Sequence, residues 1–240
     1  MAILFISDLH LSDERPQITA LFLDFMLRQV RQAEALYILG DLFEYWIGDD
    51  AVQPDHQPVI QALRSTVENG IPVYFMRGNR DFLIGEGFAA QSGCRILEDP
   101  IVTDIHRQPV LLMHGDTLCT DDHDYQKFRT MVRDPEWQQD FLSKPVSERL
   151  QLAHTYRAES KTQTQRKPPD IMDVNQQQVE QEMRRYQVNL FIHGHTHRPA
   201  IHELMIDGNK ARRIVLGDWY RKGSMLICDK HDYRMEDITD

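Results

Sequence analysis

The chain has 240 residues, and its 27 Lys and Arg against 37 Asp and Glu give a formal net charge of -10. This length predicts one domain, or one domain with a large insertion, and a hydrophobic fraction of 41% excludes a disordered chain. The negative charge argues against general binding of nucleic acid, because that affinity depends on neutralising phosphates. No apolar run reaches the roughly 18 residues that a membrane span needs. The start of the chain lacks the features of a signal peptide, and three widely spaced cysteines indicate the reducing cytoplasm.

Five short apolar runs, each followed at once by a polar cluster, predict buried strands. In chain order these runs are residues 3–6, 35–39, 73–76, 110–113 and 189–192. Helical periodicity at 16–35 and at 58–69 separates the first three runs, and Gly70 suits the end of the second helix. Strands that alternate with helices indicate an α/β layer architecture.

The C-terminal part of the chain has a different pattern. Apolar runs at 213–216, 224–228 and 233–238 are separated only by turns. This spacing predicts an antiparallel addition to the sheet, and we therefore expect a sandwich rather than a simple parallel sheet.

Residues 123–172 interrupt the alternation of strands and helices. They lack strand-like runs, and they contain nine Lys and Arg against seven Asp and Glu. An irregular loop of this length would be unusual, so the segment should form helices of its own. The predicted organisation is a core of residues 1–122 and 173–240 with an inserted helical lid at 123–172.

Each predicted strand ends in residues that can bind a metal ion. Because ligands of open α/β sheets bind beyond the carboxyl ends of the strands, these side chains are expected at one edge. The seven nitrogen and oxygen donors are Asp8, His10, Asp41, Asn79, His114, His195 and His197. Seven donors exceed what one ion uses beside a substrate; they suit two ions bridged by a carboxylate, with Mn, Fe or Zn compatible. A single His or Asp after a strand is usually a turn residue, but five clusters in succession favour a dinuclear site.

The backbone conformation of two donor segments and the positions of the remaining histidines can also be predicted. We expect extended backbone at Asp8-Leu9-His10 and at His195-Thr196-His197, because alternation then aims two side chains at one point. His193, on the last strand of the α/β part, is expected to lie in the core or beside the metal ligands. The histidines expected at the surface are His56, His106, His154, His202 and His231.

The order and spacing of these clusters resemble the calcineurin-like metallophosphoesterases. The resemblance rests on Asp8-x-His10, Gly40-Asp41, Gly78-Asn79-Arg80-Asp81, His114 and Gly194-His195-x-His197. It covers most of residues 3–200 and implies a four-layer α/β/β/α sandwich with a dinuclear centre at the strand ends. By position, it implies that one ion binds to Asp8, His10, Asp41 and His197. It implies that the other ion binds to Asp41, Asn79, His114 and His195, with Asp41 as the bridging ligand.

Arg80 departs from the common pattern of that family, in which a histidine occupies this position. The histidine can act as a general acid, whereas a guanidinium stays protonated and pairs well with phosphate oxygens. The change therefore favours a leaving group that departs as a phosphate anion, which indicates hydrolysis of a pyrophosphate bond. The alternative interpretation is that Arg80 is a solvated turn residue.

A polar face within the predicted lid suggests a phosphorylated substrate. Residues spaced by three and four would share one face of a helix, and they are Arg157, Ser160, Lys161, Thr164 and Lys167. Such a basic face suits a phosphorylated sugar, although taken alone it is more often simply solvated. Asp122 could contact a nucleobase, a ribose or a sugar. Trp46 and Phe82 could either pack in the core or line a groove for acyl chains.

Over its full length the chain resembles the branch of this family that cleaves UDP-2,3-diacylglucosamine in lipid A biosynthesis. The resemblance implies hydrolysis to UMP and 2,3-diacylglucosamine 1-phosphate (lipid X), and we expect activated water to attack the α-phosphorus. It implies two divalent ions, with Mn²⁺ the usual one. It also implies peripheral binding at the cytoplasmic face of the inner membrane, because the lipid-linked nucleotide sugar substrate is an amphiphile. We expect a monomer, although the sequence does not fix the oligomeric state. The implied catalytic residues are Arg80, Asn79 and His114. The implied substrate contacts are Asn79, Arg80, Asp122, Ser160, Thr164, Lys167 and His195.

Two other functions remain as alternatives. A nucleotide or cyclic-nucleotide phosphodiesterase would need an open site without the insertion at 123–172. A catalytically silent binding scaffold would usually have lost one or more metal ligands, and this chain has all seven.

Overall fold

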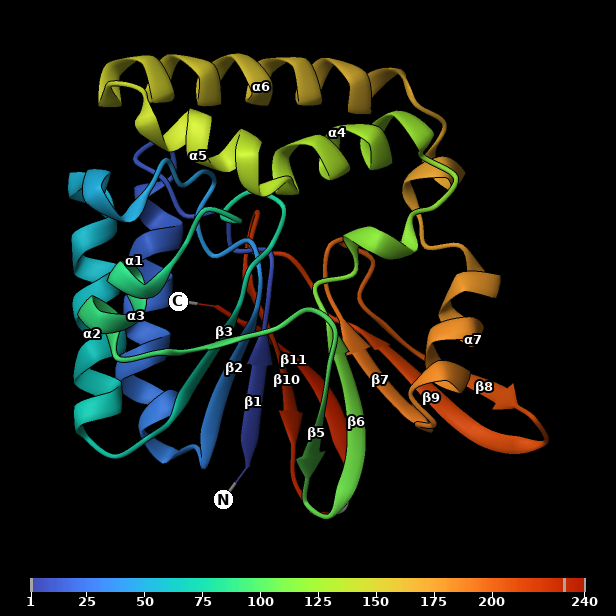
Figure 1. Cartoon of the computed structure of the whole chain (residues 1–240). Helices are drawn as coiled ribbons and strands as arrows, with labels where there is room; N and C mark the ends of the chain where they lie inside the picture. The colour runs from blue at the N-terminus through green and yellow to red at the C-terminus, as the bar shows by residue number, and fades with distance from the viewer. Residues whose placement is uncertain (1, 231, 240) are drawn as a thin grey trace.

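Two β-sheets form the centre of the molecule, and the first of them contains six strands (Figure 1). The computed structural model describes residues 2–230 and 232–239, apart from the side chains of residues 161, 164–166, 169 and 170. The strand order is β11-β10-β1-β2-β3-β4. The strands β1 to β4 pair in parallel. On the other side of β1, β10 pairs with β1 and β11 pairs with β10, both in antiparallel orientation. The strands are β1 (Ile3–Ile6), β2 (Ala35–Leu39), β3 (Val73–Met76), β4 (Arg95–Leu97), β10 (Gly223–Cys228) and β11 (Tyr233–Ile238). All residues of β1 and β2 are buried, as expected where layers cover both faces of a sheet.

The second sheet contains five strands in the order β5-β6-β7-β9-β8. Its three central strands are parallel, and a hairpin partner closes each edge in antiparallel orientation. The strands are β5 (Ile101–Ile105), β6 (Gln108–Met113), β7 (Leu190–His193), β8 (Ala200–Ile206) and β9 (Asn209–Val215). The parallel strands of both sheets therefore end at the same side of the molecule (Figure 1).

Helices cover the outer face of each sheet and complete four layers. The helices α1 (Pro16–Arg28), α2 (Gln57–Glu68) and α3 (Glu86–Ser92) pack on the first sheet, and α7 (Gln176–Arg185) packs on the second. A third apolar cluster fills the space between the sheets and includes Phe5, Leu39 and Ile192. The predicted four-layer α/β/β/α sandwich is confirmed. Short 3-10 turns lie at Val30–Gln32, Asp49–Ala51, Pro54–His56, Asp116–Leu118 and Pro169–Met172.

The segment 123–172 contains three helices, which lie over the carboxyl ends of the strands (Figure 1). They are α4 (His123–Arg133), α5 (Pro135–Ser143) and α6 (Val146–Arg166). The side chains of Asp122 and Asp134 cap α4 and α5 by accepting hydrogen bonds from backbone N–H groups of the first turn. Within the described part of the chain, no helix combines the length and the apolar character that crossing a membrane requires.

The structure corrects two expectations about the elements. Residues 213–216 were expected in the antiparallel tail, but β9 pairs in parallel with β7 and belongs to the second sheet. A register between distant strands is not encoded in the turns that flank them, and the apolar run alone fits either sheet. The helix expected over 16–35 ends at Arg28, because the chain then forms a 3-10 turn and enters β2.

Candidate functional site

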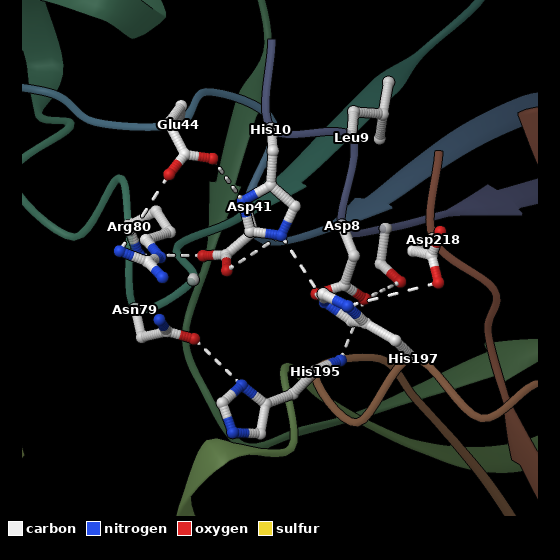
Figure 2. Close-up of polar contacts among 12 residues, drawn as sticks. Asp8, Leu9, His10, Asp41, Glu44, Asn79, Arg80, His195, His197 and Asp218 are labelled. Atoms are coloured by element: carbon white, nitrogen blue, oxygen red, sulfur yellow. Dashed lines mark hydrogen bonds and ion pairs between the residues drawn. The ribbon is translucent and has the colours of Figure 1, made fainter. Parts of the chain in front are cut away.

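The seven predicted donors lie together at the carboxyl ends of the strands, as Figure 2 shows for most of them. Asp8 and His10 follow β1, while Asp41 follows β2. From the second sheet, His114 follows β6, and the loop after β7 carries His195 and His197; Asn79 comes from the loop after β3. The two sheets thus contribute donors from opposite layers of the sandwich.

One group of donors surrounds a point between Asp8, His10 and His197, with ligand atoms within 4.8 Å of one another. The Nε2 atoms of His10 and His197 lie 3.4 Å apart, and Nε2 of His197 lies 3.4 Å from Oδ1 of Asp8. Oδ2 of Asp41 is 3.7 Å from Nε2 of His10. Four donors therefore converge here, and they are the four that position assigns to the first ion.

A second group forms around Asp41 and shares Asp8 with the first. Nε2 of His114 lies 3.8 Å from Oδ1 of Asp41. The side-chain oxygen of Asn79 is 2.9 Å from Nε2 of His114 and 2.9 Å from Nδ1 of His195. Asp41 stands between the two groups, which is the position a bridging carboxylate requires.

The chemistry of these donors fits divalent cations. Oδ1 of Asp8 is buried and faces Nε2 of His197 at 3.4 Å, while imidazole nitrogens face one another and face carboxylates. A cation among them would satisfy all of these lone pairs at once. Imidazole nitrogens with carboxylate and amide oxygens, and without thiolate, suit ions such as Mn²⁺, Fe²⁺ or Zn²⁺.

The electrostatics of the site favour positive charge. Burial lowers the pKa of His114, but the carboxylates of Asp41, Asp116 and Asp8 outweigh it and raise the pKa to about 9. Burial raises the pKa of Asp8, yet the hydrogen bond and charge of His197 hold it well below its usual range. The carboxylates thus create a negative potential that a proton on His114 partly neutralises, and bound cations would neutralise it directly.

The ligand loops have a conformation that differs from the extended one expected. Asp8 and His10 have φ angles of 57° and 51°, and His195 and His197 have φ angles of 71° and 56°. The expected extended backbone, in which side chains point to alternate sides, was wrong because the chain turns sharply at these residues. Asp and His tolerate the left-handed region better than most residues, so the donors themselves make these turns possible.

Asp81 holds two ligand loops together, a role that the sequence alone did not reveal. Its carboxylate accepts backbone N–H groups of Gly78 and Leu42, each at 2.8 Å. Gly78 also lies so close to Asp41 that a Cβ there would meet Oδ1 of Asp41 at 2.1 Å. The Gly-Asn-Arg-Asp motif was the available signal, since a glycine beside a ligand and a buried acid three residues later suggest such a turn.

Glu44 is a second residue that sequence reasoning missed. One carboxylate oxygen lies 3.1 Å from Nδ1 of His10, and the other lies 3.1 Å from Nε of Arg157 and 4.0 Å from Nη1 of Arg80 (Figure 2). Burial raises the pKa of Glu44, but the hydrogen bond and charge of His10 and the charges of Arg80 and Arg157 lower it to about 2. Glu44 therefore remains ionised and links a metal-site histidine to α6. No local pattern marked it.

A large cavity opens beside the site, between the core loops and α4 to α6. It contains about 1210 Å³ of empty space, part of which is open solvent. Its polar lining includes Asn79, Arg80 and Ser160, and its apolar lining includes Trp46 and Phe82. Aromatic side chains of the 123–172 segment also line it, namely Tyr125, Phe128, Trp137, Phe141 and Tyr156.

The predicted substrate contacts fall around this cavity. Asp122 and Lys167 both line it and pair with each other, with Nζ of Lys167 at 2.6 and 2.7 Å from the two carboxylate oxygens. Ser160 lines the cavity from α6. The side chain of Thr164 lies outside what the structure describes. His195 does not line the cavity itself, but it contacts two residues that do: Nδ1 lies 2.9 Å from the side-chain oxygen of Asn79, and its ring centroid lies 5.7 Å from that of Tyr125 in a tilted arrangement.

Two further histidines can be compared with their predictions. His193 is fully buried, in agreement with a core position beside the ligands. His56 was expected at the surface but is 2% exposed, packed against Phe43 and stacked on Trp46 at 5.5 Å. A polar residue between two Pro-containing turns has the pattern of a surface loop, and only the tertiary contacts bury it.

A sandwich of two sheets with this set of donors at the strand ends defines a metallophosphoesterase. In agreement, residues 1–199 match the family model of the calcineurin-like phosphoesterases, and the chain belongs to this family. It is therefore an enzyme, a hydrolase of a family that uses divalent metal ions, as predicted.

Curated relatives narrow the similarity to one branch. The chain is 53% identical over 219 residues to a protein of Chromohalobacter salexigens, covering 91% of this chain and 89% of the relative. It is 49% identical to a protein of Stenotrophomonas maltophilia, covering 100% and 99% of the two chains. Both relatives are named UDP-2,3-diacylglucosamine hydrolase, which confirms the predicted resemblance. Among solved structures, an archaeal phosphodiesterase has 16% identity and a TM-score of 0.49 over 99% of both chains.

Proposed function

We propose that this protein hydrolyses the diphosphate of UDP-2,3-diacylglucosamine to UMP and 2,3-diacylglucosamine 1-phosphate, a step of lipid A biosynthesis. The observation that carries the proposal is a cavity with an apolar, aromatic wall that opens on the metal-site edge through Asn79 and Arg80. A lipid with a charged head group matches both parts, because acyl chains gain by leaving water while phosphates need cationic partners. The identity of about 50% to hydrolases of this substrate supports the same assignment.

The metal ligands follow from the two groups of donors. We propose that one ion binds to Asp8, His10, Asp41 and His197, and the other to Asp41, Asn79, His114 and His195. Mn²⁺ is the proposed ion, since nitrogen and oxygen donors in this mixture suit it. When bound, such a pair supplies activation of water and neutralisation of phosphate charge.

Arg80 provides the charge that the leaving group needs. In the proposed reaction water attacks the α-phosphorus, the bond to the bridging oxygen breaks, and UMP and the sugar 1-phosphate separate. Nε of Arg80 is buried without a hydrogen-bond partner among the described residues, and its side chain is 25% exposed in the cavity lining. The guanidinium is therefore available to pair with oxygens of the departing phosphate as their charge increases. Asn79 and His114 position the reacting phosphoryl group as metal ligands.

The segment 123–172 is proposed to act as a lid on a core formed by 1–122 and 173–240. Its aromatic residues would cover the acyl chains, while Ser160, Thr164, Lys167 and Asp122 would contact the sugar phosphate. Because the substrate is a membrane amphiphile, we propose that the protein binds peripherally at the cytoplasmic face of the inner membrane. A monomer is the proposed oligomeric state.

The decisive experiment incubates purified protein with UDP-2,3-diacylglucosamine in detergent, first with Mn²⁺ and then with EDTA. We expect UMP and the lipid phosphate as products and loss of activity with EDTA. In ¹⁸O water the label should enter UMP, because attack occurs on the α-phosphorus. Label in the lipid phosphate would disprove that point of attack. Equal activity on bis(p-nitrophenyl) phosphate would favour a general phosphodiesterase instead.

Arg80→Ala tests the role of the guanidinium separately. Turnover of the diphosphate substrate should fall by about 10²- to 10³-fold, as when a donor to a developing anion is removed, while bound Mn²⁺ stays the same. Arg80→Lys, which keeps the charge without the planar fork, should recover part of the loss. Loss of metal from Arg80→Ala would contradict a role in charge compensation.

A further inference from the structure

Tyr220 is an exposed aromatic residue at the edge of the metal site. Its side chain lies 48% exposed in the loop between β9 and β10. The ring stacks on His10, with centroids 5.6 Å apart and planes inclined by 9°, and its centroid lies 5.3 Å from that of His197. The ring thus lies against two proposed metal ligands, and nearly half of the residue is open to a ligand.

The loop holds Tyr220 firmly in this position. The guanidinium of Arg15 lies 4.9 Å from the ring centroid and donates to the carbonyl oxygens of Leu9 and His10. The neighbouring Trp219 is fully buried, and its backbone N–H donates to the carbonyl oxygen of Asp8 at 3.1 Å. An exposed aromatic ring fixed in this way loses little conformational entropy when a ligand stacks on it.

The place of Tyr220 relative to the cavity indicates which part of a substrate it would meet. As far as the structure describes it, the lining of the cavity includes Glu44, Asn79 and Arg80 but neither Tyr220 nor His197. In Figure 2, His197 lies on the side of the donor cluster opposite to Arg80 and Asn79. A substrate that is cleaved at the donor cluster and fills the cavity with its lipid half must extend its other half toward His197 and Tyr220.

We propose that Tyr220 is the stacking platform for the pyrimidine base of the nucleoside monophosphate half of the substrate, a proposal that rests on the proposed function. The base stacks on the solvent-facing side of the ring, and the α-phosphate reaches the donor cluster beside His197. Arg15 sits against the same ring and fixes its orientation. Stacking on an aromatic ring needs no hydrogen-bond partner specific to one base, so the platform accounts for affinity and leaves the choice of base to other contacts.

The test measures binding of UMP to the Mn²⁺-loaded protein by calorimetry. Tyr220→Ala should weaken the binding by about fivefold to 150-fold, the range that alanine substitution of base-stacking residues gives. Tyr220→Phe should bind as the wild type does. In the wild type, 5,6-dihydro-UMP, whose base is neither planar nor aromatic, should bind more weakly than UMP, and in Tyr220→Ala the two ligands should bind equally. Bound Mn²⁺ is measured in each variant, because a purely structural role at His10 would change it.

Phe128→Ala is the matched control, since Phe128 lines the cavity on α4. It should raise the KM for the lipid substrate and leave UMP binding unchanged, whereas Tyr220→Ala should weaken both. Equal binding of UMP by Tyr220→Ala and the wild type, or no binding of UMP by the wild type, would overturn the platform. If the wild type binds UMP through Tyr220 but does not hydrolyse UDP-2,3-diacylglucosamine, the platform stands and the proposed function fails.

Discussion

Glu44→Gln tests whether the metal site depends on a residue that joins it to α6. Glu44 lies 3.1 Å from Nδ1 of His10, and its side chain is 15% exposed. Because an ionised carboxylate can only accept, it favours a proton on Nδ1 and leaves the Nε2 lone pair of His10 directed at the donor cluster. Glutamine keeps the shape of the side chain but removes its charge, so that this preference weakens.

The expected effect follows from the role of such partners. Losing the carboxylate behind a metal-ligating histidine costs about 10- to 100-fold in metal affinity, which corresponds to about 1.4–2.7 kcal/mol. Titration of the apo protein with Mn²⁺ should therefore show one ion bound more weakly and the other nearly unchanged, because Glu44 contacts only the histidine of one donor group. The kcat at saturating Mn²⁺ should fall less than the affinity does.

Glu14→Gln is the control for this experiment. Oε2 of Glu14 lies 3.3 Å from Nη2 of Arg157, the same arginine that Glu44 contacts, but the side chain of Glu14 is 65% exposed. Its ion pair is with Arg157 and not with His10. We expect it to bind Mn²⁺ as the wild type does. An affinity in Glu44→Gln within twofold of the wild type would refute the reasoning, and so would an equal loss in both variants.

Three further variants test the segment 123–172, a buried histidine and a ligand loop. In Arg149→Met, the loss of the hydrogen bonds from Arg149 to Asp50 and to the carbonyl oxygen of Ile47 should increase hydrogen exchange in 123–172; unchanged exchange would contradict an anchoring role. Burial lowers the pKa of His56 to about 4. The free energy of unfolding should therefore be highest above about pH 6.5 and should fall by up to about 3 kcal/mol as the pH decreases toward 4, because only the unfolded chain takes up the proton. His56→Phe should remove this pH dependence in denaturant titrations. Gly78→Ala places a Cβ 2.1 Å from Oδ1 of Asp41 and 2.3 Å from the backbone nitrogen of Asp41, and should abolish Mn²⁺ binding. The control is Gly208→Ala, where φ is positive but the space around the new Cβ is open; it should cost only about 1 kcal/mol of stability.

The parts of this molecule that could be predicted are those with a local cause. Buried strands such as 3–6 and 73–76 are recognisable because both faces of a parallel sheet are covered and every residue is apolar. The donors follow those strands directly, so their place at one edge is a consequence of the parallel order. The sandwich and the convergence of the seven donors could therefore be predicted from the residues, and the resemblance to the family added the four layers.

Residues whose role depends on contacts with distant parts of the chain could not be predicted from the sequence. Glu44 meets Arg157 across 113 positions of the chain, and the stacking of Tyr220 on His10 joins the loop between β9 and β10 to the loop after β1. Neither residue belongs to a motif, and each has the composition of an ordinary loop in its own neighbourhood. The burial of His56 and the parallel pairing of β9 with β7 have the same origin, since tertiary packing decides them.

Contacts between the ligand loops impose the backbone conformation of the donors. Asp8, His10, Asp41, His195 and His197 all have φ between 51° and 71°, and such backbone costs about 1–3 kcal/mol per residue unless its surroundings impose it. Contacts between the loops impose it here. The backbone N–H of Asp8 donates to the carbonyl oxygen of Gly40 at 3.1 Å, and that of His10 donates to the carbonyl oxygen of Asp41 at 2.9 Å. The backbone N–H of His195 donates to Oδ2 of Asp8 at 2.8 Å. Each ligand loop is thus held by another ligand loop. A substitution that displaces one of these loops should therefore weaken the binding of both ions. A change of the Glu44 side chain, which contacts only His10 among the donors, should weaken the binding of only one.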